Sequence, residues 1–237
     1  MEDAVGVKRQ KEKRMDSSYE KPTNTVQTDI IIAQKGVFSD AFSVFAGQKE
    51  HRNHLDNQLM CHLSANAQHG RLPIVVIADG ARSIRKKLTD LLGFSLIFIL
   101  DWYHLSDKIW QYMSQISLQK SQKEIDAKAI IALLWKGCSD ESINYLQNNV
   151  TAKNESKKTE LIEYLTKHKG EIIDYEKRKS VGKKIGSGCV EKANDIIIAH
   201  RQKKKGMAWS NNGSESLAIL KTLEINQQWQ QFWANAA

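Results

Sequence analysis

The chain lacks the features that would place it in a membrane or in an oxidising compartment. It has no apolar run near the roughly 20 residues of a membrane-spanning helix, and its first residues show no secretory signal. Its three cysteines, an odd number at distant positions, argue against a disulfide framework. Only two prolines occur, and no repeat or low-complexity linker is visible. We therefore expect a cytoplasmic protein that does not enter the membrane.

Acidic residues are outnumbered by basic ones. The 237 residues carry a formal net charge of +8 and a pI of about 9.3. An excess of this size favours polyanionic partners, nucleic acid first and anionic membranes second. Because 41% of the residues are hydrophobic, the chain can build a packed core of ordinary size.

The hydrophobic pattern predicts a mixed α/β fold with two buried strands in sequence. Residues 25–33 are rich in β-branched side chains and predict a strand, which a turn at 34–36 joins to a returning strand at 37–45. The apolar runs 74–78 and 94–100 are typical of strands buried in a parallel sheet. A short strand at 4–9 would complete five strands. Helices are expected at 51–68, 81–92, 102–169 with breaks near Gly137 and Lys153, 189–201 and 214–233.

Two aspartates follow the two buried strands directly. Asp79 comes after the strand at 74–78, and Asp101 comes after the strand at 94–100. The carboxyl ends of neighbouring parallel strands lie at one edge of the sheet, where functional sites collect. Each aspartate could instead cap the helix that follows it, because Asp is a favourable N-cap residue. The residues alone do not decide which of the two would be a metal ligand.

A third carboxylate lies near the end of the chain, after a glycine-rich segment. Glu191 follows Gly186 and Gly188, which indicate a turn or a close approach of the backbone to another group. A glutamate in the first turn of a helix also interacts favourably with the helix dipole, so this position has a structural explanation too. Asp195, one turn later on the same helix face, is a rival ligand. Asp3 begins the expected first strand and is a weak signal by itself.

Four segments, in order along almost the whole chain, resemble bacterial insertion-sequence transposases of the Kra type, which are distant relatives of the Mutator-like elements. The segments are Asp3–Gln10, Ile77–Arg82, Ile99–Leu105 and Gly186–Ser210. The resemblance implies an RNase H-like fold, with a mixed five-stranded sheet flanked by helices and an all-helical insertion before the last catalytic helix. We accordingly expect a core at 1–106, the insertion at 107–170, and the C-terminal helices of the core at 171–237.

The same resemblance implies a DDE-type transposase that cleaves DNA and transfers strands. Its catalytic and metal-binding carboxylates would be Asp3, Asp79 and Glu191, with Asp101 and His104 in supporting roles. Three carboxylates can hold two Mg²⁺ or Mn²⁺ ions, which would activate water or a DNA 3′-hydroxyl and stabilise the leaving oxygen. His104 could equally be an ordinary polar residue of a helix.

A basic segment around Glu191 fits a path for double-stranded DNA, both element ends and target. Ten Lys and Arg residues occur between 177 and 205, against two acidic residues. Phosphate contacts would dominate affinity, and Trp209 could stack on a base; a solvated charged face is the alternative. We assign DNA binding to Lys183, Lys184, Arg201, Lys203, Lys204, Lys205 and Trp209.

The start of the chain weakens the assignment of Asp3. Only two residues precede Asp3, so we expect an N-terminally truncated copy of a transposase, a homo-oligomer on DNA and associated with the bacterial nucleoid. The alternatives are a catalytically inactive DNA-binding remnant, a poorly folded product, and a nuclease that does not join strands. A zinc site is not predicted, because the spacing of His51, His54, Cys61 and His62 matches no common ligand pattern.

Overall fold

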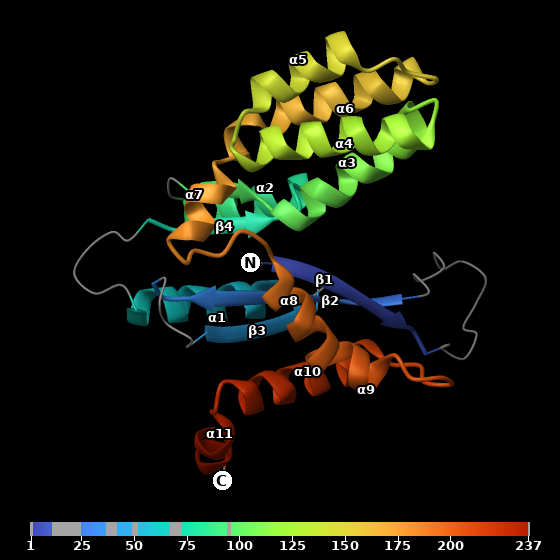
Figure 1. Ribbon diagram of the computed structural model, residues 1–237. Coiled ribbons are helices and arrows are strands. Elements are labelled where there is room, and N and C mark those ends of the chain that lie inside the picture. The colour runs from blue at the N-terminus through green and yellow to red at the C-terminus, as the bar shows by residue number, and fades with distance from the viewer. Residues whose placement is uncertain are drawn as a thin grey trace. The chain divides into compact units, whose positions relative to one another are not determined.

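The computed structural model shows an α/β protein, as the sequence predicts (Figure 1). Its described residues are 2–10, 25–36, 42–48, 52–66, 73–93 and 96–236. The chain divides into two compact units, Met1–Leu72 with Gly188–Ala237 (unit 1) and Pro73–Ser187 (unit 2). One five-stranded sheet was expected. The described strands instead form a three-stranded sheet in unit 1 and a two-stranded sheet in unit 2.

Unit 1 contains an antiparallel sheet in the order β1-β2-β3. Its strands are β1 Glu2–Lys8, β2 Thr25–Gln34 and β3 Phe42–Gln48. The β-branched run in β2 places it at the centre, where it pairs with both neighbours. The expected hairpin from β2 to β3 is confirmed, although residues 37–41 of the predicted returning strand lie outside the described residues.

Helices pack on both faces of this sheet because its residues alternate between two apolar faces. Ile30 and Ile32 of β2 join a core with Val190 and Ile197 from the C-terminal helices. On the other face, Phe45 contacts His62 of α1, with ring centroids 5.3 Å apart. The helices of unit 1 are α1 Arg52–Asn66, α8 Gly188–Asn194, a π-helical turn Asp195–Ala199, α9 His200–Gln202, α10 Asn211–Ile225 and α11 Trp229–Ala236.

The expected single helix from 214 to 233 is two helices, α10 and α11. α10 ends at Ile225, and Gln227 then takes a left-handed φ of 59°. The side chain of Asn226 explains the stop. Its Oδ1 accepts a hydrogen bond from the Val44 backbone N–H at 2.8 Å, and its Nδ2 donates to the Val44 carbonyl at 2.8 Å. This amide therefore ties the end of α10 to β3, which helical spacing in the sequence does not reveal.

Unit 2 begins with a β–α–β segment. β4 Val75–Ala78 pairs in parallel with β5 Ile97–Leu100, and α2 Arg82–Leu92 connects them. Gly93 ends α2 in the left-handed conformation with φ 54°, as glycine commonly does at this position. The parallel pairing of the two apolar runs is confirmed, while residues 94 and 95 of the predicted second run lie outside the described residues.

Four helices follow and pack side by side around an apolar core (Figure 1). They are α3 Trp102–Ile116, α4 Lys120–Trp135, α5 Ser139–Asn149 and α6 Glu155–His168, followed by a 3₁₀ turn Lys169–Glu171 and α7 Tyr175–Ser180. The predicted breaks near Gly137 and Lys153 are confirmed, and a third break at Ser117 was not predicted. These helices belong to the same compact unit as β4 and β5. Within the part of the chain that the structure describes, no helix combines the length and apolar character that a membrane crossing requires.

Candidate carboxylate site

Asp79 occupies the exposed end of a buried strand. Val76, Ile77 and Ala78 of β4 are buried, and the next residue, Asp79, is exposed. Its Oδ1 accepts a hydrogen bond from the Ala81 backbone N–H at 2.8 Å, which closes a tight turn. The cap residue of α2 is Ala81, and no side chain caps this helix. The helix-cap explanation of Asp79 is therefore wrong, and its carboxylate is accessible to a ligand.

Asp101, at the end of the neighbouring strand, has the opposite environment. It is 0% exposed and caps α3, because its Oδ1 accepts hydrogen bonds from the Tyr103 N–H at 2.7 Å and the His104 N–H at 3.2 Å. Its Oδ2 accepts from both the backbone N–H and the hydroxyl of Ser187. Both carboxylate oxygens are thus engaged inside the protein. The helix-cap explanation holds for Asp101, and Asp79 is the better candidate for a metal ligand.

The contact between Asp101 and Ser187 joins distant parts of unit 2. Gly186 lies so close to the Tyr103 ring that a side chain there would collide with it, which confirms that this glycine marks a close approach of the backbone. The Trp102 N–H also donates to the Ile185 carbonyl at 3.1 Å. No local pattern singles out Ser187, because its partner is 86 residues away. The exposed His104 lies in the first turn of α3.

The other two carboxylates belong to unit 1. Glu191 lies in the first turn of α8 and is exposed, while the neighbouring Val190 is buried against the sheet. α8 packs against β1, the strand in which Asp3 stands opposite Ile30. The side chain of Asp3 lies outside the described residues. Asp195 is also exposed and begins the π-helical turn, a feature that is frequent at functional sites.

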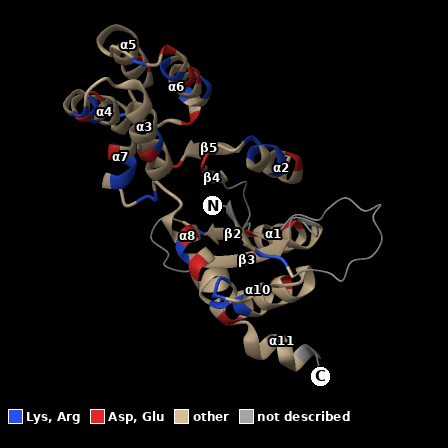
Figure 2. Ribbon diagram, turned by 90° about the vertical axis from the view of Figure 1, so that its right-hand side faces the viewer, with Lys and Arg blue, Asp and Glu red and all other residues tan. Residues whose placement is uncertain are grey.

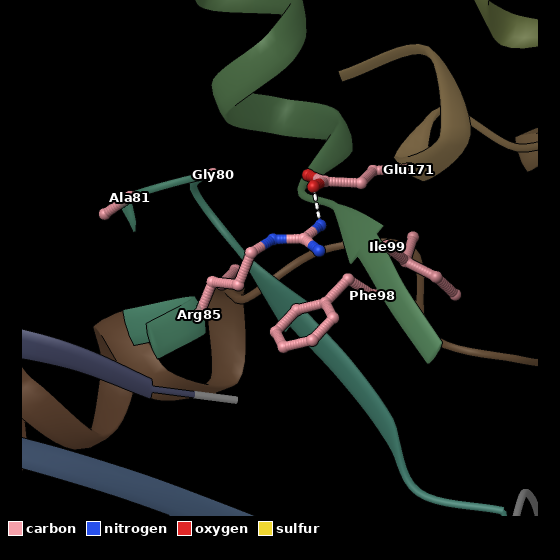
Figure 3. A pocket seen from close by; sticks show the side chains of 7 residues that line it. Gly80, Ala81, Arg85, Phe98, Ile99 and Glu171 are labelled. Atoms are coloured by element: carbon pink, nitrogen blue, oxygen red, sulfur yellow. Dashed lines mark ion pairs between the residues drawn. The ribbon is translucent and has the colours of Figure 1, made fainter. Parts of the chain in front are cut away.

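Beside Asp79, a small hollow is lined by charged and aromatic groups of unit 2 (Figure 3). Arg85 of α2 forms an ion pair with Glu171 of the 3₁₀ turn. The Arg85 guanidinium also lies over the Phe98 ring, 4.2 Å from its centroid. Gly80 and Ala81, which follow Asp79 directly, line the same hollow. No sequence pattern indicates a role for Arg85, Phe98 or Glu171.

His168 at the end of α6 completes this cluster. Its side chain is 4% exposed, and its Nδ1 lies 2.9 Å from Oε2 of Glu171. Burial, then the nearby positive charges of Lys167, Arg85 and Lys108, lowers the pKa of His168 to about 4, against an opposing effect of Asp79. The neutral imidazole therefore donates its Nδ1 proton to Glu171. The Tyr164 ring lies against the imidazole at a tilt of 51°, with centroids 4.7 Å apart. Burial and the charge of Asp79 raise the pKa of Tyr164 to about 12.

We expect the stability of unit 2 to fall as the pH falls from about 6.5 to about 4. Over this interval the unfolded His168 binds a proton and the folded one does not, so protonation favours unfolding. The loss is at most about 3.5 kcal/mol, since the pKa falls by about 2.5 units and one unit corresponds to ~1.4 kcal/mol. Urea unfolding of the wild type and of His168→Asn at several pH values, followed by tryptophan fluorescence, measures it. A His168→Asn variant with the same pH dependence as the wild type would contradict the assignment.

The lysines and arginines that were predicted to bind DNA lie in two separate segments, one in each unit. The basic segment 177–184 spans α7 and the following turn, where Lys183 and Lys184 are exposed and the Arg178 Nε donates to the Lys184 carbonyl at 2.7 Å. Figure 2 shows the Lys and Arg residues of α7 in blue. The basic segment 201–205 lies in unit 1, where Arg201, Lys203, Lys204 and Lys205 are exposed.

Trp209 holds the basic segment 201–205 against β1. Its backbone N–H donates to the Lys8 carbonyl at 3.0 Å, and its carbonyl accepts from the Gln10 N–H at 2.8 Å. The indole Nε1 donates to the Gln202 carbonyl at 3.1 Å, and the ring packs against the core of unit 1. These contacts favour a structural role for Trp209 over base stacking. Arg9, the residue after β1, pairs with this tryptophan in an isolated parallel β-bridge.

Across the residues that the structure describes, no three His, Cys, Asp or Glu side chains are grouped so that they could hold a metal ion. Two of the three expected ligands, Asp3 and Glu191, lie in unit 1 and the third, Asp79, lies in unit 2. Cys61 is a free, exposed thiol, and His51 of the rejected zinc pattern lies outside the described residues. No family model, curated protein or solved structure matches the chain.

Proposed function

We propose that the chain is a DDE-type transposase domain that cleaves and joins DNA strands with Mg²⁺ or Mn²⁺. The observation that carries the proposal is the contrast between the two strand-end aspartates. Asp79 presents an exposed carboxylate directly after a buried parallel strand, while the neighbouring Asp101 is a buried helix cap. This is the division between metal ligand and supporting residue that the resemblance to insertion-sequence transposases implies.

An RNase H-like fold belongs to the same proposal. The order of elements supports it: three antiparallel strands, a helix, a parallel β–α–β segment, a group of helices and then the helix with Glu191. This is the order that the resemblance leads us to expect. The helices between β5 and α7 support an insertion at 107–170, although the first of them, α3, begins at Trp102.

The donor atoms suit the proposed metal. Asp79 and Glu191 are exposed carboxylates, and Mg²⁺ prefers hard oxygen ligands of this kind. The resemblance names Asp3 as the third carboxylate of this kind. When bound, the metal ions would activate water or a 3′-hydroxyl and stabilise the leaving oxygen. The protein itself would orient the Asp79 carboxylate through the turn that the Ala81 N–H closes.

A cleavage assay tests the proposal directly. Purified protein is incubated with supercoiled plasmid and a 3′-hydroxyl oligonucleotide in Mg²⁺, Mn²⁺, Ca²⁺ or EDTA. We expect nicked plasmid and joined oligonucleotide in Mg²⁺ and Mn²⁺ only. Nicking without joining would instead identify a nuclease, and salt-sensitive binding without nicking would identify a DNA-binding remnant. Either of these results would overturn the transposase assignment.

The proposed binding of DNA by the basic segment 201–205 predicts how the affinity for DNA depends on salt concentration. Each phosphate contact contributes roughly 0.9 to the slope of log affinity against log salt concentration. Replacing Lys203, Lys204 and Lys205 by alanine should therefore lower this slope by about 2–3 if each lysine contacts one phosphate. Fluorescence anisotropy of labelled duplex DNA in EDTA measures it. Replacing Lys120, Lys128 and Lys136, three exposed lysines in or directly after α4, is the matched control for net charge. An equal change in both variants would mean that only net charge matters.

A further inference from the structure

The turn after Asp79 is in direct contact with a buried imidazole. A Cβ atom added to Gly80 would lie 2.9 Å from Cε1 of His168 and 2.9 Å from Cδ1 of Leu100, closer than packed atoms approach. Gly80 also has a φ of +85°, which other residues rarely adopt. His168 therefore rests against the backbone of the turn itself. His168 and Leu100 together limit how far the Asp79–Gly80–Ala81 turn can move toward them.

The position of the imidazole is fixed by charged groups from two other elements. Glu171 of the 3₁₀ turn accepts the His168 Nδ1 proton, with 2.9 Å between the two atoms, and pairs with Arg85 of α2. Arg85 is held in turn over the Phe98 ring of β5 (Figure 3). α2 starts directly after the Asp79 turn. The turn is therefore supported at Gly80 by His168, and at α2 by the pair of Arg85 with Glu171.

A purely space-filling role does not require these polar groups. Burying an ionic or hydrogen-bonded group costs desolvation free energy, and an apolar side chain of similar volume often fills such a space at no loss of stability. What a connected polar network adds is one defined geometry, because its hydrogen bonds are satisfied in a single arrangement. The cluster has the properties expected of a group that orients a neighbouring ligand.

We propose that His168, held by Glu171 and Arg85, is a positioning residue that fixes the Asp79 turn for metal binding. This inference rests on the metal-binding role proposed for Asp79. It assigns to the end of α6 an indirect part in the chemistry at the end of β4, exerted through the Asp79 turn. Residues that orient a metal ligand typically change metal affinity or activity by about 10- to 100-fold when they are replaced.

The test compares three replacements of His168 with a surface control. Asn can donate the same hydrogen bond to Glu171, Phe keeps the ring without the hydrogen bond, and Ala removes both. Glu163→Ala, on an exposed position of α6, is the control. Two quantities are measured: the Mg²⁺ concentration for half-maximal nicking, and the rate of amide hydrogen exchange in residues 79–82. Thermal unfolding and DNA binding in EDTA are recorded for every variant.

We expect His168→Ala to raise the half-maximal Mg²⁺ concentration by about tenfold and to accelerate exchange in residues 79–82. His168→Asn keeps the hydrogen bond to Glu171 but lacks the ring atoms that lie against Gly80, and His168→Phe keeps the ring but lacks the hydrogen bond, so each should recover only part of both effects. DNA binding in EDTA should stay unchanged in all variants. Unchanged exchange in the turn of His168→Ala, or activity that falls only with the folded fraction, would overturn the proposal. If the wild-type chain does not nick DNA, the proposed function fails, and the exchange measurement still decides whether His168 fixes the turn.

Discussion

Replacing Asp79 by asparagine is expected to slow metal-dependent nicking by about 10³-fold, which corresponds to ~4 kcal/mol of transition-state stabilisation. Asparagine keeps the shape of the side chain but removes the negative charge that a Mg²⁺ ligand supplies. Its Oδ1 can still accept the hydrogen bond from the Ala81 N–H. Because position 79 is exposed, the free energy of unfolding should change by less than about 0.5 kcal/mol. Plasmid nicking and urea unfolding are measured on the same preparation.

Matched variants separate this effect from a general change of charge. Asp90→Asn, at an exposed position of α2, should leave nicking unchanged. Glu191→Gln should reproduce the loss seen at Asp79, whereas Asp195→Asn should not. If Asp195→Asn is the impaired variant, Asp195 replaces Glu191 as the ligand. Full activity of Asp79→Asn would remove the basis for a DDE mechanism in this chain.

The strands and helices that are indicated by their own residues could be predicted from the sequence. The runs that form β4 and β5 are apolar on both faces, which suits strands covered on both sides, and the β-branched residues of β2 indicate a strand. The parallel pairing of β4 with β5 follows from the helix between them. Helix ends were harder to predict. The stop at Ile225 depends on the hydrogen bonds between Asn226 and Val44, which are 182 residues apart.

The candidate site was also predicted only in part, because it too depends on contacts between residues that are far apart in the sequence. Sequence analysis placed Asp79 and Asp101 at the ends of neighbouring strands, which the structure confirms. It left open which one is accessible, because burial depends on what covers each strand end. Asp101 is buried by a contact with Ser187, and the Asp79 turn is supported by His168. Gly80 was the available signal, since a glycine after a candidate ligand can indicate a close neighbour.

Removal of the buried carboxylate should have the largest effect on stability. We expect Asp101→Ala to lower the free energy of unfolding of unit 2 by about 3–5 kcal/mol, because buried hydrogen-bond donors lose a charged acceptor. The donors are the backbone N–H groups of Tyr103, His104 and Ser187, and the Ser187 hydroxyl. Ser187→Ala, which removes one donor and leaves the carboxylate, should cost about 1.5–3 kcal/mol. Urea unfolding followed by tryptophan fluorescence measures both.

The double variant Asp101→Ala/Ser187→Ala tests whether the two residues act as one unit. Its loss should be smaller than the two single losses added together, because the hydroxyl that Asp101→Ala leaves unpaired is then absent. Additive losses would show that the contact between them contributes little. Nicking by Asp101→Ala, measured at a temperature where it remains folded, should stay near the wild-type rate per folded molecule. Asp101 would then support the fold and Asp79 the chemistry, although both end neighbouring strands of the same sheet.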